Sequence, residues 1–204
     1  MNKILKNTAH LFSFVFHPLV VPSIGFILLF YSLPGFELYP PRMRNIMMVI
    51  IAFSTGILPL TFIFLMSVAA GFSSKMEHHR DRMLPYIFSA FSIYMGAQLM
   101  GKLPVPGVFR LFMLGACLVL IMLFLITMKW KISGHAAAMG GLTGLFLSLA
   151  FRYAIDLKWV IIAAIFVSGI VASSRILLTK HSALQVYLGY GLGLVTIFLT
   201  VYLF

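Results

Sequence analysis

Residues 182–204 read SALQVYLGYGLGLVTIFLTVYLF, an apolar stretch without a single charged side chain. A helix needs about 20 apolar residues to cross a hydrocarbon core of roughly 30 Å, so this stretch is long enough to span a membrane. Gly189 and Gly193 stand four residues apart within it, a spacing that lets two helix backbones approach closely in lipid. The stretch therefore predicts a spanning helix that packs through its glycines against another helix.

Six further stretches of similar character precede it: Leu11–Leu33, Asn45–Ala70, Pro85–Met100, Val108–Met128, Ala136–Phe151 and Leu157–Ser173. The first is longer than the apolar region of a signal peptide, roughly 7–15 residues, so we expect a retained span. Pro18, Pro22 and Pro59 lie inside predicted spans and are expected to kink them. Gly140 and Gly144 repeat the four-residue spacing and likewise predict close helix packing.

The composition supports lipid as the main solvent. Hydrophobic residues make up 62% of the chain and charged residues 9%, whereas a soluble domain carries about 25% charged residues. The fold class that we expect is all-α: a polytopic transmembrane helix bundle with six or seven spans. The loops between spans are short, which predicts a single membrane domain over residues 1–204.

The net charge of +11 does not by itself indicate a nucleic-acid-binding protein. In a soluble protein this charge points to nucleic acid, but here the basic residues lie in short loops between apolar runs. Anchoring at the surface of the lipid bilayer explains most of them, and we expect no nucleic-acid partner. Cys117 is the one cysteine, so an intrachain disulfide is impossible and core packing is its expected role.

The polar residues gather on one predicted face. If the spans alternate across the bilayer, one face receives the N-terminus and residues 71–84, 129–134 and 174–181. All six histidines fall on or near this face: His10, His17, His78, His79, His135 and His181. This segregation predicts a functional site on that face.

Cationic side chains and a helix start on this face predict an anion site. Lys75, Arg82 and Arg175 supply positive charge, and arginine binds phosphate in bidentate fashion. Ser133 and Gly134 lead into a predicted helix, whose N-terminus offers backbone N–H groups and the positive end of the helix dipole. Ser133 is also a candidate helix cap.

Two imidazoles accompany these groups. His135 and His181 are candidates for a general acid and a nucleophile, because imidazole serves both roles near neutral pH. His17 precedes Pro18 in an apolar run, so we expect its ring to point toward a partner or a cavity. Two roles remain open for His17: its ring lines a substrate site, or it makes a structural hydrogen bond.

Three ordered segments carry a family pattern. Lys75 and Arg82 have the spacing K-x6-R, residues 133–135 read S-G-H, and Ser174-Arg175 precede His181 with the spacing S-R-x5-H. In these segments, from about Lys75 to Gly193, the chain resembles the type 2 phosphatidic acid phosphatase superfamily. The motifs of that family are K-x6-R-P, P-S-G-H and S-R-x5-H-x3-D.

The resemblance implies a fold and a mechanism. It implies a core like that of the type 2 phosphatidic acid phosphatases over residues 71–204, preceded by N-terminal helices over residues 1–70. It implies that His181 attacks phosphorus to form a phosphohistidine, and that His135 protonates the leaving lipid alkoxide. The residues implied to hold the phosphate oxygens are Lys75, Arg82, Ser133, Gly134 and Arg175. No metal and no other cofactor is implied.

The chain departs from the family motifs at three positions. Met83 and Ile132 replace the motif prolines, and Gln185 replaces the aspartate that orients the nucleophilic histidine. The side-chain carbonyl of Gln185 accepts the same hydrogen bond but brings no charge, which predicts a weaker nucleophile. Glu77 or Asp81 is an alternative source of the missing carboxylate. Further possible contributors to the site are Arg80, His79 and His17.

The resulting expectation is a membrane lipid phosphatase that hydrolyses a phosphomonoester or diphosphate of a lipid. A related enzymatic option is phosphotransfer to an acceptor other than water. The alternatives are a lipid-phosphate-binding membrane protein without catalysis and, less favoured, a transporter or flippase, which needs a polar pathway through the membrane. The expected partner is a lipid with a phosphate headgroup, and the expected location is a bacterial inner membrane.

Overall fold

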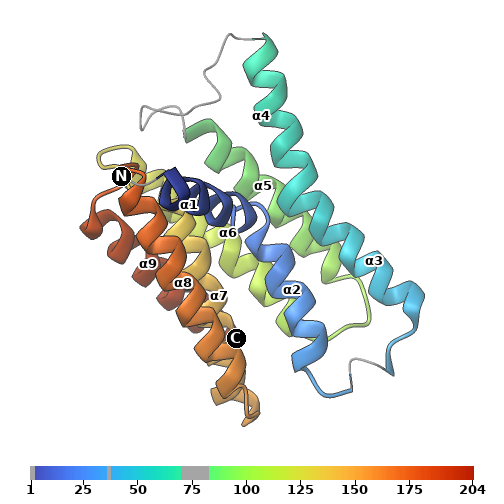
Figure 1. Ribbon diagram of the computed structural model, residues 1–204. Coiled ribbons are helices and arrows are strands. Elements are labelled where there is room, and N and C mark those ends of the chain that lie inside the picture. The colour runs from blue at the N-terminus through green and yellow to red at the C-terminus, as the bar shows by residue number, and fades with distance from the viewer. Residues whose placement is uncertain (1–2, 36–37, 70–82) are drawn as a thin grey trace. The chain divides into compact units, whose positions relative to one another are not determined.

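The computed structural model describes residues 3–35, 38–69 and 83–204, and these residues form helices and connecting turns with no strand among them (Figure 1). The chain divides into two compact units. Unit 1 consists of Met1–Val21 and Lys131–Phe204, and unit 2 consists of Pro22–Trp130. The all-α prediction is confirmed.

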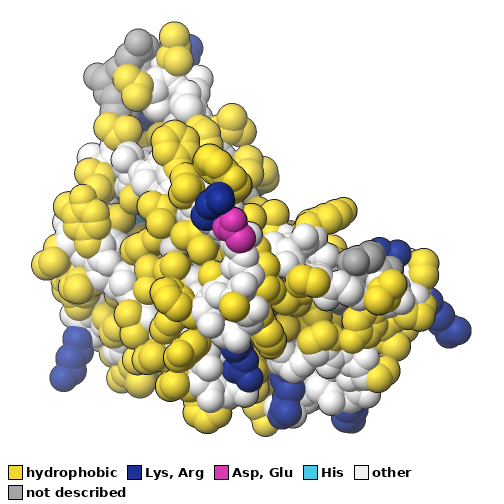
Figure 2. Space-filling model, turned by 90° about the horizontal axis from the view of Figure 1, so that it is seen from below, with side chains coloured by type: hydrophobic (Ala, Val, Ile, Leu, Met, Phe, Trp, Pro, Cys, Tyr) yellow, Lys and Arg dark blue, Asp and Glu magenta, His cyan; other side chains and the backbone are white. Residues whose placement is uncertain are grey.

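Six helices are long and apolar enough to cross a membrane: Pro41–Val68, Met83–Met100, Gly107–Thr127, Gly134–Tyr153, Lys158–Leu177 and Ala183–Leu203. They correspond to six of the seven predicted spans and fit a multi-pass membrane protein. The space-filling view agrees, because hydrophobic side chains cover most of the face in Figure 2 and Lys and Arg are scattered among them. Many large apolar side chains are exposed, including Phe14 at 78% and Trp159 at 74%, as expected for a surface that faces lipid.

The prediction of one continuous span over Leu11–Leu33 is wrong. The segment forms α1 (Lys3–Val15) and α2 (Val21–Ser32), joined by a turn in which Val20 N and Val21 N donate to the His17 carbonyl. Pro18 explains the break, because proline has no N–H and disfavours helical geometry at the residue before it. The expected kink at Pro22 is also wrong, since Pro22 occupies the first turn of α2, where proline is tolerated.

The span Pro41–Val68 is irregular in its middle. It consists of α3 (Pro41–Ile51), a π-helical turn η2 (Ala52–Ile57) and α4 (Leu58–Ala69), and Leu58 N donates to Phe53 O, five residues back. Pro59 cannot donate to the Thr55 carbonyl and its ring crowds that carbonyl, so the backbone widens just before it. The expected disturbance at Pro59 therefore takes the form of a π-turn.

Helix α5 (Met83–Met100) packs against this irregular turn and against α6 (Gly107–Thr127) in unit 2. The Ser92 hydroxyl donates to the Ser54 carbonyl at 2.7 Å, so a side chain satisfies a backbone group in the π-turn. Cys117 is buried and its thiol donates to the Ala90 carbonyl at 3.3 Å. The packing role expected for Cys117 is confirmed.

In unit 1, α7 (Gly134–Tyr153) packs against both α8 (Lys158–Leu177) and α9 (Ala183–Leu203), while α1 packs against α8. The α7–α9 pair is held at one end by Arg152, whose Nη1 donates to the Val201 carbonyl at 2.6 Å. At the other end, Ser133 N donates to the Gln185 carbonyl at 3.2 Å.

Glycines set the distance between α7 and α9, as their spacing predicts. A Cβ atom added at Gly140 would overlap the Tyr190 carbonyl, and one added at Gly193 would overlap the Ala137 carbonyl. A Cβ atom at Gly189 would lie 2.6 Å from the Ser133 carbonyl oxygen. The two backbones are therefore in direct contact, which only glycine permits at these positions.

This packing yields a stability prediction. Gly193→Ala forces α7 and α9 apart, and we expect a loss of about 1–3 kcal/mol in the free energy of unfolding, the usual cost of overpacking. Gly191→Ala is the matched control, because a Cβ atom at Gly191 meets no atom within 4 Å. Thermal unfolding of the detergent-solubilised protein measures both. Equal stability of the two variants would show that the glycine contact is not tight.

Candidate functional site

The candidate site lies in unit 1, where the N-termini of α7 and α9 meet the C-terminus of α8. Ser133 is the N-cap of α7 and is fully buried, and its hydroxyl accepts a hydrogen bond from Ala136 N at 3.3 Å. The predicted capping role is confirmed. Gly134 and His135 are the first two residues of α7, so both lie at the positive end of the helix dipole.

His135 is held by the backbone of α1. Its Nε2 lies 3.1 Å from the carbonyl oxygen of Ser13. A carbonyl oxygen only accepts hydrogen bonds, so Nε2 carries a proton and donates it. The Ser13 hydroxyl is buried and has no hydrogen-bond partner among the described residues, so the carbonyl of Ser13 makes the polar contact there.

His17 lies directly beside His135. The two imidazole rings meet edge to face, with their centroids 5.3 Å apart. His17 Nδ1 accepts a hydrogen bond from Leu19 N at 3.3 Å, which places the proton of the neutral ring on Nε2. Burial lowers the pKa of His17, and the positive charge of Arg175 lowers it further, so the ring is neutral near pH 7. The direct neighbour of the candidate acid is thus an uncharged imidazole.

Gln185 contacts two groups through one atom. Its Oε1 accepts from Ser182 N at 3.2 Å and lies 3.1 Å from His181 Nδ1. The Ser182 hydroxyl in turn accepts from Gln185 N at 3.4 Å, which completes a capping box at the start of α9.

The capping box fixes the tautomer of His181. A backbone N–H always donates, so the Gln185 atom that faces Ser182 N must be the oxygen and not the amide nitrogen. That oxygen can only accept from His181, and therefore Nδ1 carries the imidazole proton. The lone pair of the neutral His181 ring then resides on Nε2, the arrangement that a nucleophilic histidine requires.

Arg175 and His181 share the electrostatic environment of His135. Both, together with His17, act on His135 electrostatically, an interaction that weakens with distance. Arg175 is half-buried near the end of α8, and His181 is 6% exposed. The structure thus brings together six predicted site residues: Ser133, Gly134, His135, Arg175, His181 and Gln185. His17, predicted as a possible contributor, is a direct neighbour of His135.

For most of the other predicted site residues the structure gives no position. Lys75, Glu77, His79, Arg80 and Arg82, with His78 and Asp81, lie outside the described residues, so their roles stay predictions. His10 is described and is exposed on α1. In residues 3–35, 38–69 and 83–204, no group of three or more His, Cys, Asp or Glu side chains is arranged to hold a metal ion.

Two contributors to the site were missed by sequence reasoning. Ser182 had a usable signal, because Ser182 and Gln185 have the S-x-x-Q spacing of a capping box. The Ser13 carbonyl had none, because any residue supplies a backbone acceptor and the contact joins positions far apart in the chain.

The shared oxygen of Gln185 predicts that Gln185, and not Ser182, sets the tautomer of His181. Gln185→Ala removes the acceptor at His181, so we expect the ring to lose its Nδ1–H preference. Ser182→Ala removes only the cap acceptor and should keep the tautomer, and each change should cost about 1 kcal/mol of stability. Nitrogen chemical shifts of labelled histidine report the tautomer. An unchanged tautomer in Gln185→Ala would contradict the assigned hydrogen bond.

Comparison of the chain with protein-family models, with curated proteins and with solved structures found no match. Its function is therefore inferred from the spacing of its motifs and from the geometry of unit 1. The geometry gives a cluster of three imidazoles, one guanidinium and two capped helix N-termini at one end of a membrane-spanning unit.

Proposed function

We propose that the chain is a membrane lipid phosphatase that hydrolyses a phosphomonoester or diphosphate of a lipid. The observation that carries this proposal is the hydrogen bond between His181 Nδ1 and Gln185 Oε1, which leaves the lone pair of the neutral His181 ring on Nε2. His135 and Arg175 belong to the same unit. The order of the three motif segments supports a core like that of the type 2 phosphatidic acid phosphatases.

His181 is the nucleophile in this mechanism. Its Nε2 attacks phosphorus, the bond between phosphorus and the lipid oxygen breaks, and a phosphohistidine forms. The ring becomes cationic in this step, and its Nδ1–H remains bonded to Gln185 Oε1. Gln185 is a positioning residue here, since it holds the imidazole plane and tautomer without touching the phosphoryl group.

His135 is the general acid. In this role the ring starts as the imidazolium, with protons on both Nδ1 and Nε2. It gives the Nε2 proton to the departing lipid alkoxide, which leaves a neutral ring, and then takes a proton from the water that hydrolyses the phosphohistidine. The Nε2–H of His135 points at the Ser13 carbonyl, so the leaving oxygen has to replace that carbonyl as acceptor before the proton can move. The contact with α1 thus keeps the donor proton on Nε2 until substrate arrives.

Positive charge stabilises the phosphoryl oxygens. Arg175 supplies a guanidinium, and the N-terminus of α7 at Ser133 and Gly134 supplies the positive end of a helix dipole. Lys75 and Arg82 belong to the same set through the family resemblance. We place the enzyme in a bacterial inner membrane, which agrees with six apolar helices joined by short loops.

One observation favours a second candidate function. Gln185 has no charge, so it stabilises the imidazolium of His181 less than a carboxylate does. In this second function, the chain binds lipid phosphates through the same cations and histidines but does not hydrolyse them. The two functions share a ligand and differ in phosphate release.

The first test is metal-free phosphate release. Purified protein in detergent should release phosphate from phosphatidic acid or a polyprenyl diphosphate, and His181→Ala should reduce release to background because the nucleophile is lost. Radiolabelled substrate followed by acid quenching should trap label on His181. His10→Ala is the matched control, since His10 is exposed on α1. Undiminished release in His181→Ala would disprove the mechanism.

The second test adds the missing charge. Gln185→Glu keeps an oxygen near the position of Oε1 and should raise kcat by roughly tenfold, the effect of about 1.4 kcal/mol more stabilisation of the imidazolium. Gln98→Glu is the control for added charge, because Gln98 lies on α5 in unit 2 and pairs with Arg110. A wild-type protein that binds but is inactive, together with an active Gln185→Glu variant, would identify the binding function.

A further inference from the structure

His17 lies in the turn that follows α1, and this turn fixes its backbone. His17 N donates to the Phe14 carbonyl at 3.3 Å. The His17 carbonyl accepts from Val20 N at 2.8 Å and from Val21 N at 3.0 Å. Pro18, the next residue, has no N–H to donate and prevents α1 from continuing. The turn therefore holds the main chain of His17 in one position.

The same turn fixes the ring of His17. Leu19 N donates to His17 Nδ1 at 3.3 Å, so a local hydrogen bond sets the orientation of the side chain. The ring then meets the His135 ring edge to face, with 85° between the planes and 5.3 Å between the centroids. Pairs of aromatic rings prefer this arrangement, and it stabilises them beyond the effect of burial alone. The turn after α1 thus presents a fixed ring to the candidate acid.

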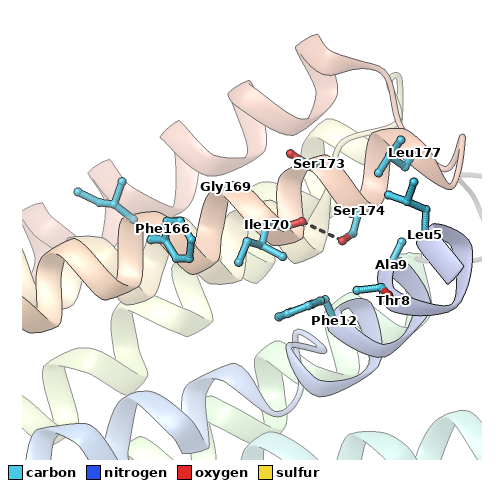
Figure 3. Close-up of a pocket in the computed structure, with 11 residues that line it drawn as sticks. Leu5, Thr8, Ala9, Phe12, Phe166, Gly169, Ile170, Ser173, Ser174 and Leu177 are labelled. Atoms are coloured by element: carbon cyan, nitrogen blue, oxygen red, sulfur yellow. Dashed lines mark hydrogen bonds between the residues drawn. The ribbon is translucent and has the colours of Figure 1, made fainter.

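Helix α1 is itself held within unit 1. It packs against α8, and Ala9 and Phe12 of α1 line an apolar pocket together with Ile170 of α8 (Figure 3). Ala9 and Ser13 are the buried residues of α1, and they stand four residues apart on one face of the helix. His17 follows after four more residues, just past the helix end. The contacts of this segment with unit 1 therefore extend from Ala9 to His17.

Two different contacts from this segment hold the His135 ring. The Ser13 carbonyl accepts from His135 Nε2 at 3.1 Å, and the His17 ring packs against the imidazole. A hydrogen bond fixes one atom of a ring but lets the ring plane tilt, whereas a packed neighbour restricts the plane. The two contacts together therefore define the direction in which Nε2 presents its proton.

The charge of His17 suits this position. Arg175 and His181 already act on His135 electrostatically, and the general acid is an imidazolium when it begins its task. A further cation beside the ring would oppose that charge. His17 is uncharged near pH 7, because burial lowers its pKa and Arg175 lowers it further. It therefore packs against His135 without repulsion.

We propose that His17 is a positioning residue for the general acid, because its uncharged ring fixes the plane of the His135 imidazole. The inference rests on the proposed function for the role of His135, whereas the contact between the rings is independent of that role. It assigns separate tasks to the two features of His17. The hydrogen bond from Leu19 N orients the His17 ring, and the ring orients the acid.

Two substitutions separate the ring of His17 from its hydrogen bond. His17→Phe keeps an aromatic ring but loses the acceptor for Leu19 N, whereas His17→Asn keeps an acceptor near the position of Nδ1 but loses the ring. We expect His17→Asn to lower kcat for phosphate release roughly tenfold or more with little change in KM, because the acid is misplaced. His17→Phe should keep most of kcat. His10→Asn is the matched control, since His10 is exposed on α1.

Solvent exchange of the Nε2 proton of His135 tests the same contact without substrate. Proton NMR of the protein with nitrogen-labelled histidine should show exchange roughly three- to tenfold faster in His17→Asn than in wild type or His17→Phe, the effect of one lost aromatic pair. Three results overturn the proposal: unchanged exchange in His17→Asn, a rise of KM in both variants, or a loss of kcat in His17→Phe that equals the loss in His17→Asn. Faster exchange in His17→Asn, when the wild-type protein releases no phosphate, contradicts only the phosphatase.

Discussion

The contact between the backbones of α7 and α9 determines the geometry of unit 1. Glycines at 140, 144, 189 and 193 let each helix touch the carbonyl groups of the other. In lipid there is little hydrophobic force between helices, so such close contacts supply much of the attraction. The same contact brings Ser133 N to the Gln185 carbonyl and so sets the distance between the two helix starts. The positions of His135 and His181 both follow from it.

Much of the fold was predictable from the sequence because apolar length is a strong signal in membrane proteins. Six spans and four glycines at the contact between α7 and α9 were identified correctly. The error at Leu11–Leu33 has a physical cause. Hydropathy reports only how apolar the side chains are, whereas Pro18 ends a helix within an apolar run through its effect on the backbone. The π-turn before Pro59 was visible only as an expected kink, since sequence does not specify how a helix accommodates proline.

The candidate site was predictable where side chains define it and less so where the backbone does. Motif spacing selected Ser133, His135, Arg175 and His181, which lie in one cluster of unit 1. The hydrogen bond from His181 to the side-chain oxygen of Gln185 was anticipated from chemistry alone, and the structure has it at 3.1 Å. The bond from His135 to Ser13 was not, because α1 was expected to lie outside the motif-bearing part of the chain.

Helix α1 contacts the candidate acid, although the motif-bearing part of the chain was expected to begin only at residue 71. The helix packs against α8, and the carbonyl of Ser13 near its end accepts from His135 Nε2. His17, in the turn after α1, lies edge to face with the same imidazole. Because Pro18 breaks the predicted first span, α1 belongs to unit 1 while α2 belongs to unit 2. The broken first span thus gives unit 1 both the backbone acceptor and the neighbouring imidazole that contact His135.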